Sequence, residues 1–158
     1  MMTSKSSSTQ RSSRKGIVWA MLCVAVLGFL DAAYLTVNHF VNAIPPCSSI
    51  SNCEKVLTSS YASVFGVPIA LLGALYYLTI MVAVIVYLDT KRMRVLRAAA
   101  LFTTVGFVVS AGLVTLQLAV IHAICIFCMT SAGTSTILFV LGMLTLRRPK
   151  VTPASSGV

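Results

Sequence analysis

The chain has 158 residues, of which 58% are hydrophobic and 9% are charged. Soluble domains carry about 25% charged residues, so this composition excludes an ordinary soluble domain and indicates an integral membrane protein. The formal net charge of +9 raises the question of nucleic-acid binding. The distribution of the basic residues along the chain, described below, argues against that function.

The first segment, residues 1–16, consists mainly of Ser, Thr, Lys and Arg. Segments with so little apolar content bury too little surface to fold alone, so the sequence predicts a disordered basic cytoplasmic tail. A cleaved signal peptide is the alternative interpretation. It is disfavoured because the apolar run that follows is longer than a typical signal-peptide core.

Four apolar runs follow, and each reaches the roughly 20 residues that a helix needs to cross a bilayer. They predict an all-α integral membrane protein, a four-transmembrane-helix bundle over residues 17–147, followed by a second cytoplasmic tail over 148–158. The predicted spans are about 17–41, 67–88, 95–119 and 124–146.

The basic residues lie in clusters that flank these spans. Of the 12 Lys and Arg residues, all except Lys55 precede the first span, lie between the second span and the first residues of the third, or follow the fourth. Four crossings place these three clusters on one side, which the positive-inside rule makes cytoplasmic. We therefore expect a multi-pass plasma-membrane protein with both termini cytoplasmic, whose basic flanks contact membrane lipid and bind no nucleic acid.

The longest loop, residues 42–66, is expected on the opposite, extracytoplasmic side. Ser51 followed by Glu54 is a capping-box pattern, which predicts a short helix from about Asn52 to Ser60. That helix would place Cys53 in its first turn, where exposed backbone N–H groups favour a thiolate.

Two cysteine pairs fall on the outer side of this topology, where thiols can be oxidised. Cys47 and Cys53 lie in the outer loop, and Cys125 and Cys128 lie at the start of the fourth span. The second pair has the i, i+3 spacing that shares one helix face, and its position at a helix N-terminus favours a thiolate. Two pairs on one side predict an electron relay, whereas Cys23 in the first span is expected to serve packing.

Other polar residues of the spans leave alternatives open. Asp31 is either a functional intramembrane carboxylate or, as we favour, a protonated or hydrogen-bonded group that holds helices together. His122 stands three residues before Cys125, so it either handles protons for a thiol or marks the membrane interface. Gly106 and Ser110 have small-xxx-small spacing, which favours close helix packing without chemistry.

Several stretches resemble one known family. The loop cysteines with the run from Cys53 to Pro68, the Cys125-Ile126-Phe127-Cys128 motif, and Ala33-Tyr34-Leu35-Thr36 are similar to the bacterial and archaeal vitamin K epoxide reductase (VKOR) family. The resemblance covers roughly residues 17–146.

The resemblance implies a membrane thiol:quinone oxidoreductase that generates disulfides. It implies that Cys47 and Cys53 are shuttle cysteines, which take electrons from a thioredoxin-like (DsbA-like) extracytoplasmic protein acting in trans. Cys125 and Cys128 would form the redox centre next to a quinone of the ubiquinone or menaquinone type. The expected order is partner to Cys47, Cys53 to Cys125, and Cys128 to the quinone, by exchange through mixed disulfides.

The resemblance also implies residues that surround the quinone. Ser63 and Phe65 match the stretch that covers the quinone pocket, and His122 is expected beside it. Ala62 and Ala132 stand where animal members that reduce the epoxide carry Asn and Tyr. We therefore expect quinone reduction and do not expect epoxide reduction.

Two other classes of function compete with the relay. The four cysteines, with or without His122, could bind a metal, but the step from Cys47 to Cys53 is wider than in usual zinc ligand pairs, so no metal is expected. A non-catalytic four-span scaffold with a disulfide-stapled loop is the other alternative. A quinone-linked disulfide generator of the DsbB type would do the same job as the relay, but the loop pattern fits it less well.

Overall fold

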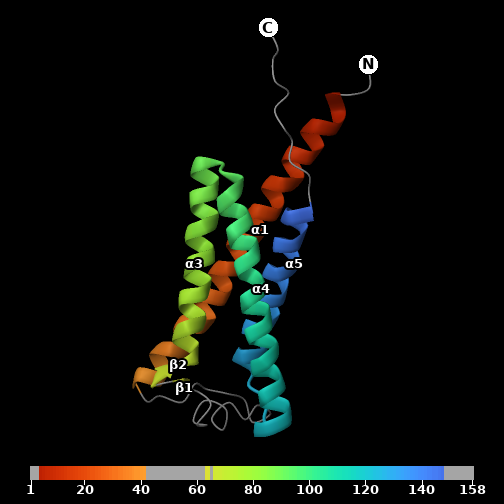
Figure 1. Ribbon diagram of the computed structural model, residues 1–158. Helices are drawn as coiled ribbons and strands as arrows, with labels where there is room; N and C mark the ends of the chain where they lie inside the picture. The colour runs from red at the N-terminus through yellow and green to blue at the C-terminus, as the bar shows by residue number, and fades with distance from the viewer. Residues whose placement is uncertain (1–3, 42–62, 65, 148–158) are drawn as a thin grey trace.

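The computed structural model describes residues 4–41, 63–64 and 66–147. It contains the long helices α1 (Ser4–Val41), α3 (Ile69–Thr90), α4 (Met93–Leu116) and α5 (Ile126–Arg147), and α4 continues into the π-helix η1 (Gln117–Ile121) (Figure 1). Two short antiparallel strands, β1 (Ser63–Val64) and β2 (Val67–Pro68), precede α3. Four of the described helical segments are long and apolar enough to cross a membrane, which confirms the predicted four-span helical bundle.

The helical segments lie close to the predicted spans. They comprise Lys15–Val41, Ile69–Thr90, Met93–Ile121 and Ile126–Arg147, so no end differs from its predicted position by more than two residues. The second span begins late because Pro68 pairs with Ser63 across the strand pair and has extended backbone. Gly66, with φ of 80°, occupies the turn between the strands, and this left-handed conformation strongly favours glycine.

Helix α1 begins at Ser4, well before the first span. The structure therefore corrects the expectation of disorder for residues 4–16. No proline lies in this segment and its only glycine is Gly16, so nothing in the sequence stops the helix from extending beyond the span. The predicted loop helix and the tail over 148–158 fall outside the described residues.

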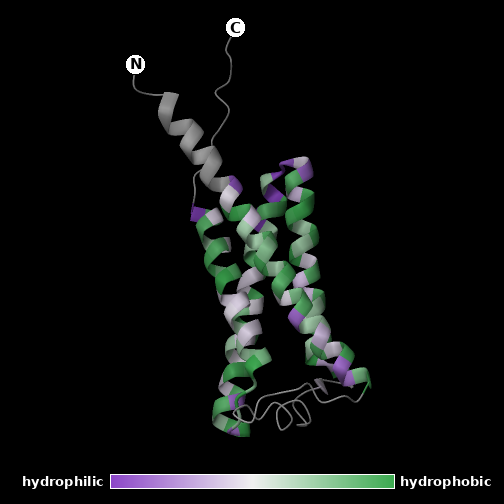
Figure 2. Cartoon of the chain, turned by 180° about the vertical axis from the view of Figure 1, so that it is seen from behind, coloured by the Kyte–Doolittle hydropathy of each residue, from purple (hydrophilic) through white to green (hydrophobic). Residues whose placement is uncertain are grey.

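Successive helices run in opposite directions, so the bundle has two chemically different ends (Figure 1). The start of the first span, the α3–α4 turn and the end of α5 lie at one end, where hydrophilic residues are seen (Figure 2). The exposed basic residues at this end are Lys15, Lys91, Arg92, Arg94, Arg97 and Arg147. The opposite end holds the strand pair, η1 and the start of α5.

Small residues allow the helices to approach closely in the core. A Cβ atom added at Gly28 would lie 2.4 Å from the Tyr77 ring, and one at Gly106 would lie 2.1 Å from the Tyr76 ring. The predicted packing role of Gly106 is thus confirmed, since it makes room for an aromatic ring between α3 and α4. Gly106 and Ser110, its predicted companion, both lie on the wall of a cavity.

Candidate functional site

The Cys125–Cys128 pair lies at the N-terminus of α5. The Cys125 carbonyl accepts a hydrogen bond from the Met129 N–H at 3.0 Å, so Cys125 caps the helix and Cys128 lies in its first turn. Cys125 is 0% exposed, whereas Cys128 is half-buried. Cys125 is buried because Ile121 and Ala123, which precede α5, and Phe127, in the first turn of α5, pack around it.

Gln117 organises the link between η1 and α5. Its backbone carbonyl accepts hydrogen bonds from the N–H groups of His122 and Ala123, the latter at 3.2 Å. Its side-chain Oε1 accepts a hydrogen bond from the Cys125 N–H, also at 3.2 Å. Gln117 is only 3% exposed, and π-helical turns such as η1 are frequent at functional sites.

Sequence reasoning missed Gln117. The available signal was the single amide side chain of the third span, which lies near the end of that span and shortly before the cysteine motif. A single sequence gives no register for a π-helical turn, so the hydrogen bond from the Cys125 N–H could not be derived.

His122 does not share a helical face with Cys125. It adopts the left-handed conformation, with φ of 49° and ψ of 40°, where η1 ends, and α5 begins only at Ile126. Its side chain is exposed and is not part of the cavity wall. The shared face required α5 to start early, and the left-handed turn prevents this.

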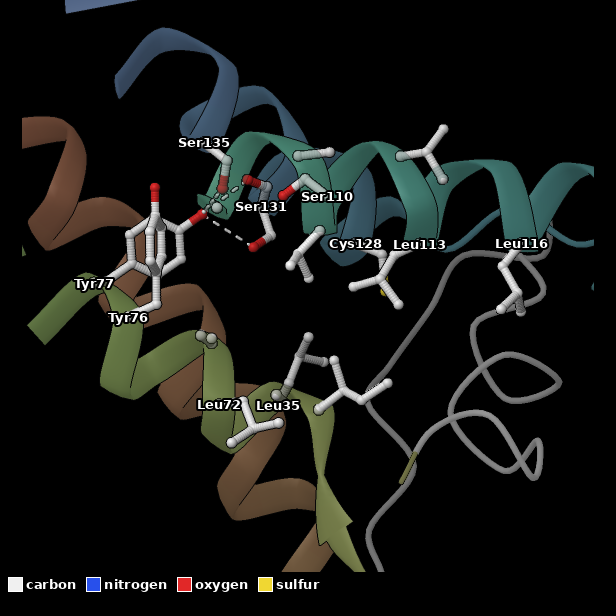
Figure 3. Close-up of a pocket in the computed structure, with 18 of the residues that line it drawn as sticks. Leu35, Leu72, Tyr76, Tyr77, Ser110, Leu113, Leu116, Cys128, Ser131 and Ser135 are labelled. Carbon is white, nitrogen blue, oxygen red and sulfur yellow. Dashed lines mark hydrogen bonds between the residues drawn. The ribbon is translucent and has the colours of Figure 1, made fainter. Parts of the chain in front are cut away.

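A cavity of about 470 Å³ opens beside Cys128 (Figure 3). This volume is typical of small-molecule sites, which are mostly apolar with a few placed polar groups. The wall is formed by all four long helices together with η1, and Cys128 is part of it. Its larger apolar side chains include Leu35, Leu72, Phe102, Val105, Leu113 and Leu116.

A hydroxyl cluster closes the end of the cavity that lies farther into the bundle (Figure 3). The Tyr77 hydroxyl lies 2.8 Å from the Ser131 carbonyl oxygen, 2.7 Å from Thr134 Oγ1 and 2.9 Å from Ser135 Oγ. Tyr77 is 1% exposed, so these bonds satisfy a buried hydroxyl and connect α3 to α5. The neighbouring Tyr76 hydroxyl is also buried but makes no hydrogen bond within the described residues.

Of the remaining residues predicted for the quinone site, some lie on the cavity wall and others do not. Ala132 lies on the cavity wall, one turn beyond Cys128. Ser63 lies in β1, paired with Pro68, and is not part of that wall. The other predicted site residues, Cys47, Cys53, Ala62 and Phe65, fall outside the residues that the structure describes.

Asp31 has a buried carboxylate oxygen in the first span. Its Oδ2 atom makes no hydrogen bond within the described part of the chain. The expectation that this carboxyl joins helices by a hydrogen bond is therefore not met by Oδ2. Asp31 is also not among the residues that form the cavity wall.

A comparison with models of known protein families found a match that spans all the residues of this site. The chain matches the family model described as "Vitamin K epoxide reductase family" over residues 19–143, a range that includes the cavity and both cysteines of α5. The chain belongs to the vitamin K epoxide reductase family. No curated protein matches the chain. As a VKOR-family member with four membrane-spanning helices, it is a multi-pass membrane protein with oxidoreductase activity.

Proposed function

We propose that this protein is a disulfide-forming thiol:quinone oxidoreductase, in which Cys125 and Cys128 are oxidised by a quinone bound in the cavity. The observation that carries the proposal is the position of Cys128. It lies on the wall of an apolar cavity of about 470 Å³ and in the first turn of α5 at once. One thiol therefore faces a space suited to a lipid-borne ring, and its sequence partner lies directly before the same helix.

The residues around the cavity fit a quinone. Its wall is mostly apolar and membrane-embedded, as a lipid-soluble ring requires, and Cys128 together with few other polar groups lines it. A bound quinone supplies a two-electron acceptor that also takes up two protons. Two thiols lose two electrons and two protons when they form one disulfide, so the Cys125–Cys128 pair and one quinone balance.

The position of the pair at the start of α5 favours the reactive form of Cys128. The unpaired N–H groups of a helix's first turn stabilise negative charge, and the thiolate is the nucleophilic form of cysteine. The hydrogen bond from the Cys125 N–H to Gln117 Oε1 fixes the backbone at the cap. The residues of this chain thus orient the pair, and burial keeps water from Cys125.

We further propose that electrons enter through Cys47 and Cys53 from an extracytoplasmic thioredoxin-like protein that acts in trans. Helix α1 ends at Val41 and β1 begins at Ser63, and both points lie at the Cys125 end of the bundle (Figure 1). The described residues on either side of segment 42–62 therefore both lie at the end of the bundle that holds the redox pair. Because Cys125 is 0% exposed, its attack by Cys53 requires movement of the link that covers it.

The same proposal orients the protein in the plasma membrane. The exposed basic residues lie on the helix ends opposite Cys125 (Figure 1), so the positive-inside rule makes that end cytoplasmic and the redox end extracytoplasmic. The acceptor proposed here is of the ubiquinone or menaquinone type, since both are lipid-soluble rings that can reach the cavity from the bilayer.

Anaerobic mixing of the purified protein with a reduced thioredoxin-like protein and a quinone tests the proposal. Quinone absorbance and the thiols of the soluble partner are followed together, and one quinone should be consumed for every two thiols. Cys125→Ser and Cys128→Ser should each abolish turnover. Cys23→Ser is the matched control, because Cys23 lies exposed in the first span and should be dispensable.

Two results would contradict the proposed function. The first is the absence of quinone reduction by the wild-type protein with every quinone tried. The second is turnover that persists in both the Cys125→Ser and the Cys128→Ser variant.

A further inference from the structure

Most polar groups on the cavity wall are already engaged within the protein. The hydroxyls of Tyr77, Ser131 and Ser135 bond with one another in the cluster that closes the inner end. The Gln117 Oε1 atom accepts the Cys125 N–H. These groups stabilise the walls of the cavity rather than leaving a hydrogen bond for a ligand.

Ser110 on α4 differs from them. It lies on the cavity wall, is half-buried, and makes no side-chain hydrogen bond within the described residues. Serine and threonine in helices often bond the carbonyl of the residue four positions earlier. Thr115, on the same helix, does so with the Ala111 carbonyl at 2.8 Å, whereas Ser110 forms no such bond.

The position of Ser110 along the cavity allows its hydroxyl to contact a ligand bound beside Cys128. In Figure 3 it lies between the tyrosine end and Cys128. One turn farther in, Gly106 lies against the Tyr76 ring, whereas Ser110 carries its hydroxyl on the same cavity wall. A hydroxyl in a membrane-embedded apolar cavity without a partner is unfavourable, and a ligand with an acceptor oxygen relieves that cost.

We propose that the Ser110 hydroxyl donates a hydrogen bond to a carbonyl oxygen of the quinone and thereby positions the ring beside Cys128. Ser110 is then a ligand-binding residue that selects rings with an acceptor oxygen and takes no part in electron transfer. This inference rests on the proposed function, since it concerns the same cavity.

Equilibrium binding separates the hydrogen bond from packing and from turnover. The background is Cys128→Ala protein in lipid nanodiscs, which cannot complete the redox reaction. The probes are 2-methyl-1,4-naphthoquinone and 2-methylnaphthalene, which share a ring system but differ in the carbonyl oxygens. Ser110→Ala should weaken quinone binding about two- to tenfold, the effect of one neutral hydrogen bond, and leave hydrocarbon binding unchanged.

A spectroscopic readout accompanies the affinities. The infrared carbonyl band of the bound quinone should move toward its unbonded frequency in Ser110→Ala. Thr115→Ala is the matched control, because it removes a hydroxyl from the same helix that bonds its own backbone. It should change neither the affinity nor the band. If Ser110→Ala does not fold, Ser110→Cys, which keeps the side-chain size but donates weakly, gives the same comparison.

Unchanged quinone affinity together with an unchanged carbonyl band would overturn the role of Ser110. An equal loss of affinity for the quinone and the hydrocarbon would overturn it too, since that pattern shows lost packing. Both results leave the proposed function standing. Failure of the background protein, with Ser110 intact, to bind any quinone would instead contradict the proposed function itself.

Discussion

Replacing Gln117 should loosen the link that buries Cys125. Gln117→Met keeps the side-chain length but removes Oε1, and so leaves the buried Cys125 N–H without its 3.2 Å partner. An unsatisfied buried donor costs about 1–3 kcal/mol. The backbone bonds from the Gln117 carbonyl remain, so we expect this cost to fall on the link and not on the whole bundle.

The corresponding change in local opening is large enough to measure. A cost of about 1–3 kcal/mol raises the opened population about 5- to 150-fold. Hydrogen exchange of the amides of residues 122–125 and the alkylation rate of reduced Cys125 should both rise by a factor in this range. Thr115→Ala serves as the control, since it removes a side-chain hydrogen bond two residues away at an exposed position. Exchange and alkylation that match the wild-type values in Gln117→Met would refute the role of Oε1.

Three further predictions concern packing and topology. Tyr77→Phe should lower the free energy of unfolding by about 1–3 kcal/mol, because it breaks the hydroxyl cluster. Tyr76→Phe should lower it less, since the Tyr76 hydroxyl makes no hydrogen bond within the described residues. Thermal unfolding of both variants in detergent compares the two effects. Gly28→Ala should destabilise by about 1–3 kcal/mol, because its Cβ would meet the Tyr77 ring at 2.4 Å, whereas Gly112→Ala has nothing within 4 Å and should not. A membrane-impermeant thiol reagent should label the reduced cysteines of segment 42–62 in intact cells, and labelling only after lysis would reverse the proposed orientation.

The sequence predicted the parts of the fold that depend on one helix at a time. Apolar runs long enough to cross a bilayer are visible without any partner, so the four spans were found to within two residues at each end. The place of Cys125 and Cys128 at a helix start followed from the same runs. The helical structure of residues 4–16 was missed, since composition does not show whether an existing helix extends into a polar segment.

The features that depend on the packing of several helices could not be predicted from the sequence. These spans carry apolar residues on most sides, so the sequence does not show which face of α3 or α4 lines the cavity. Ser110 was interpreted as packing for this reason, although it lies on the cavity wall. His122 was misplaced because the π-helical turn and its left-handed end change the register before α5. Ala132, placed by the family resemblance, does lie on that wall.

The different burial of Cys125 and Cys128 bears on how the proposed relay keeps the quinone and the incoming thiol at separate sulfur atoms. Cys128 is open to the lipid-facing cavity, whereas Cys125 lies under the link that Gln117 holds. A quinone in the cavity can therefore reach one sulfur, and a thiol from the outer segment reaches the other only when the link opens. In the proposed relay, the pair therefore accepts electrons at Cys125 and releases them at Cys128 in separate steps. In the same relay, the Gln117 hydrogen bond limits how often Cys125 becomes accessible, which is why its removal should speed alkylation of Cys125.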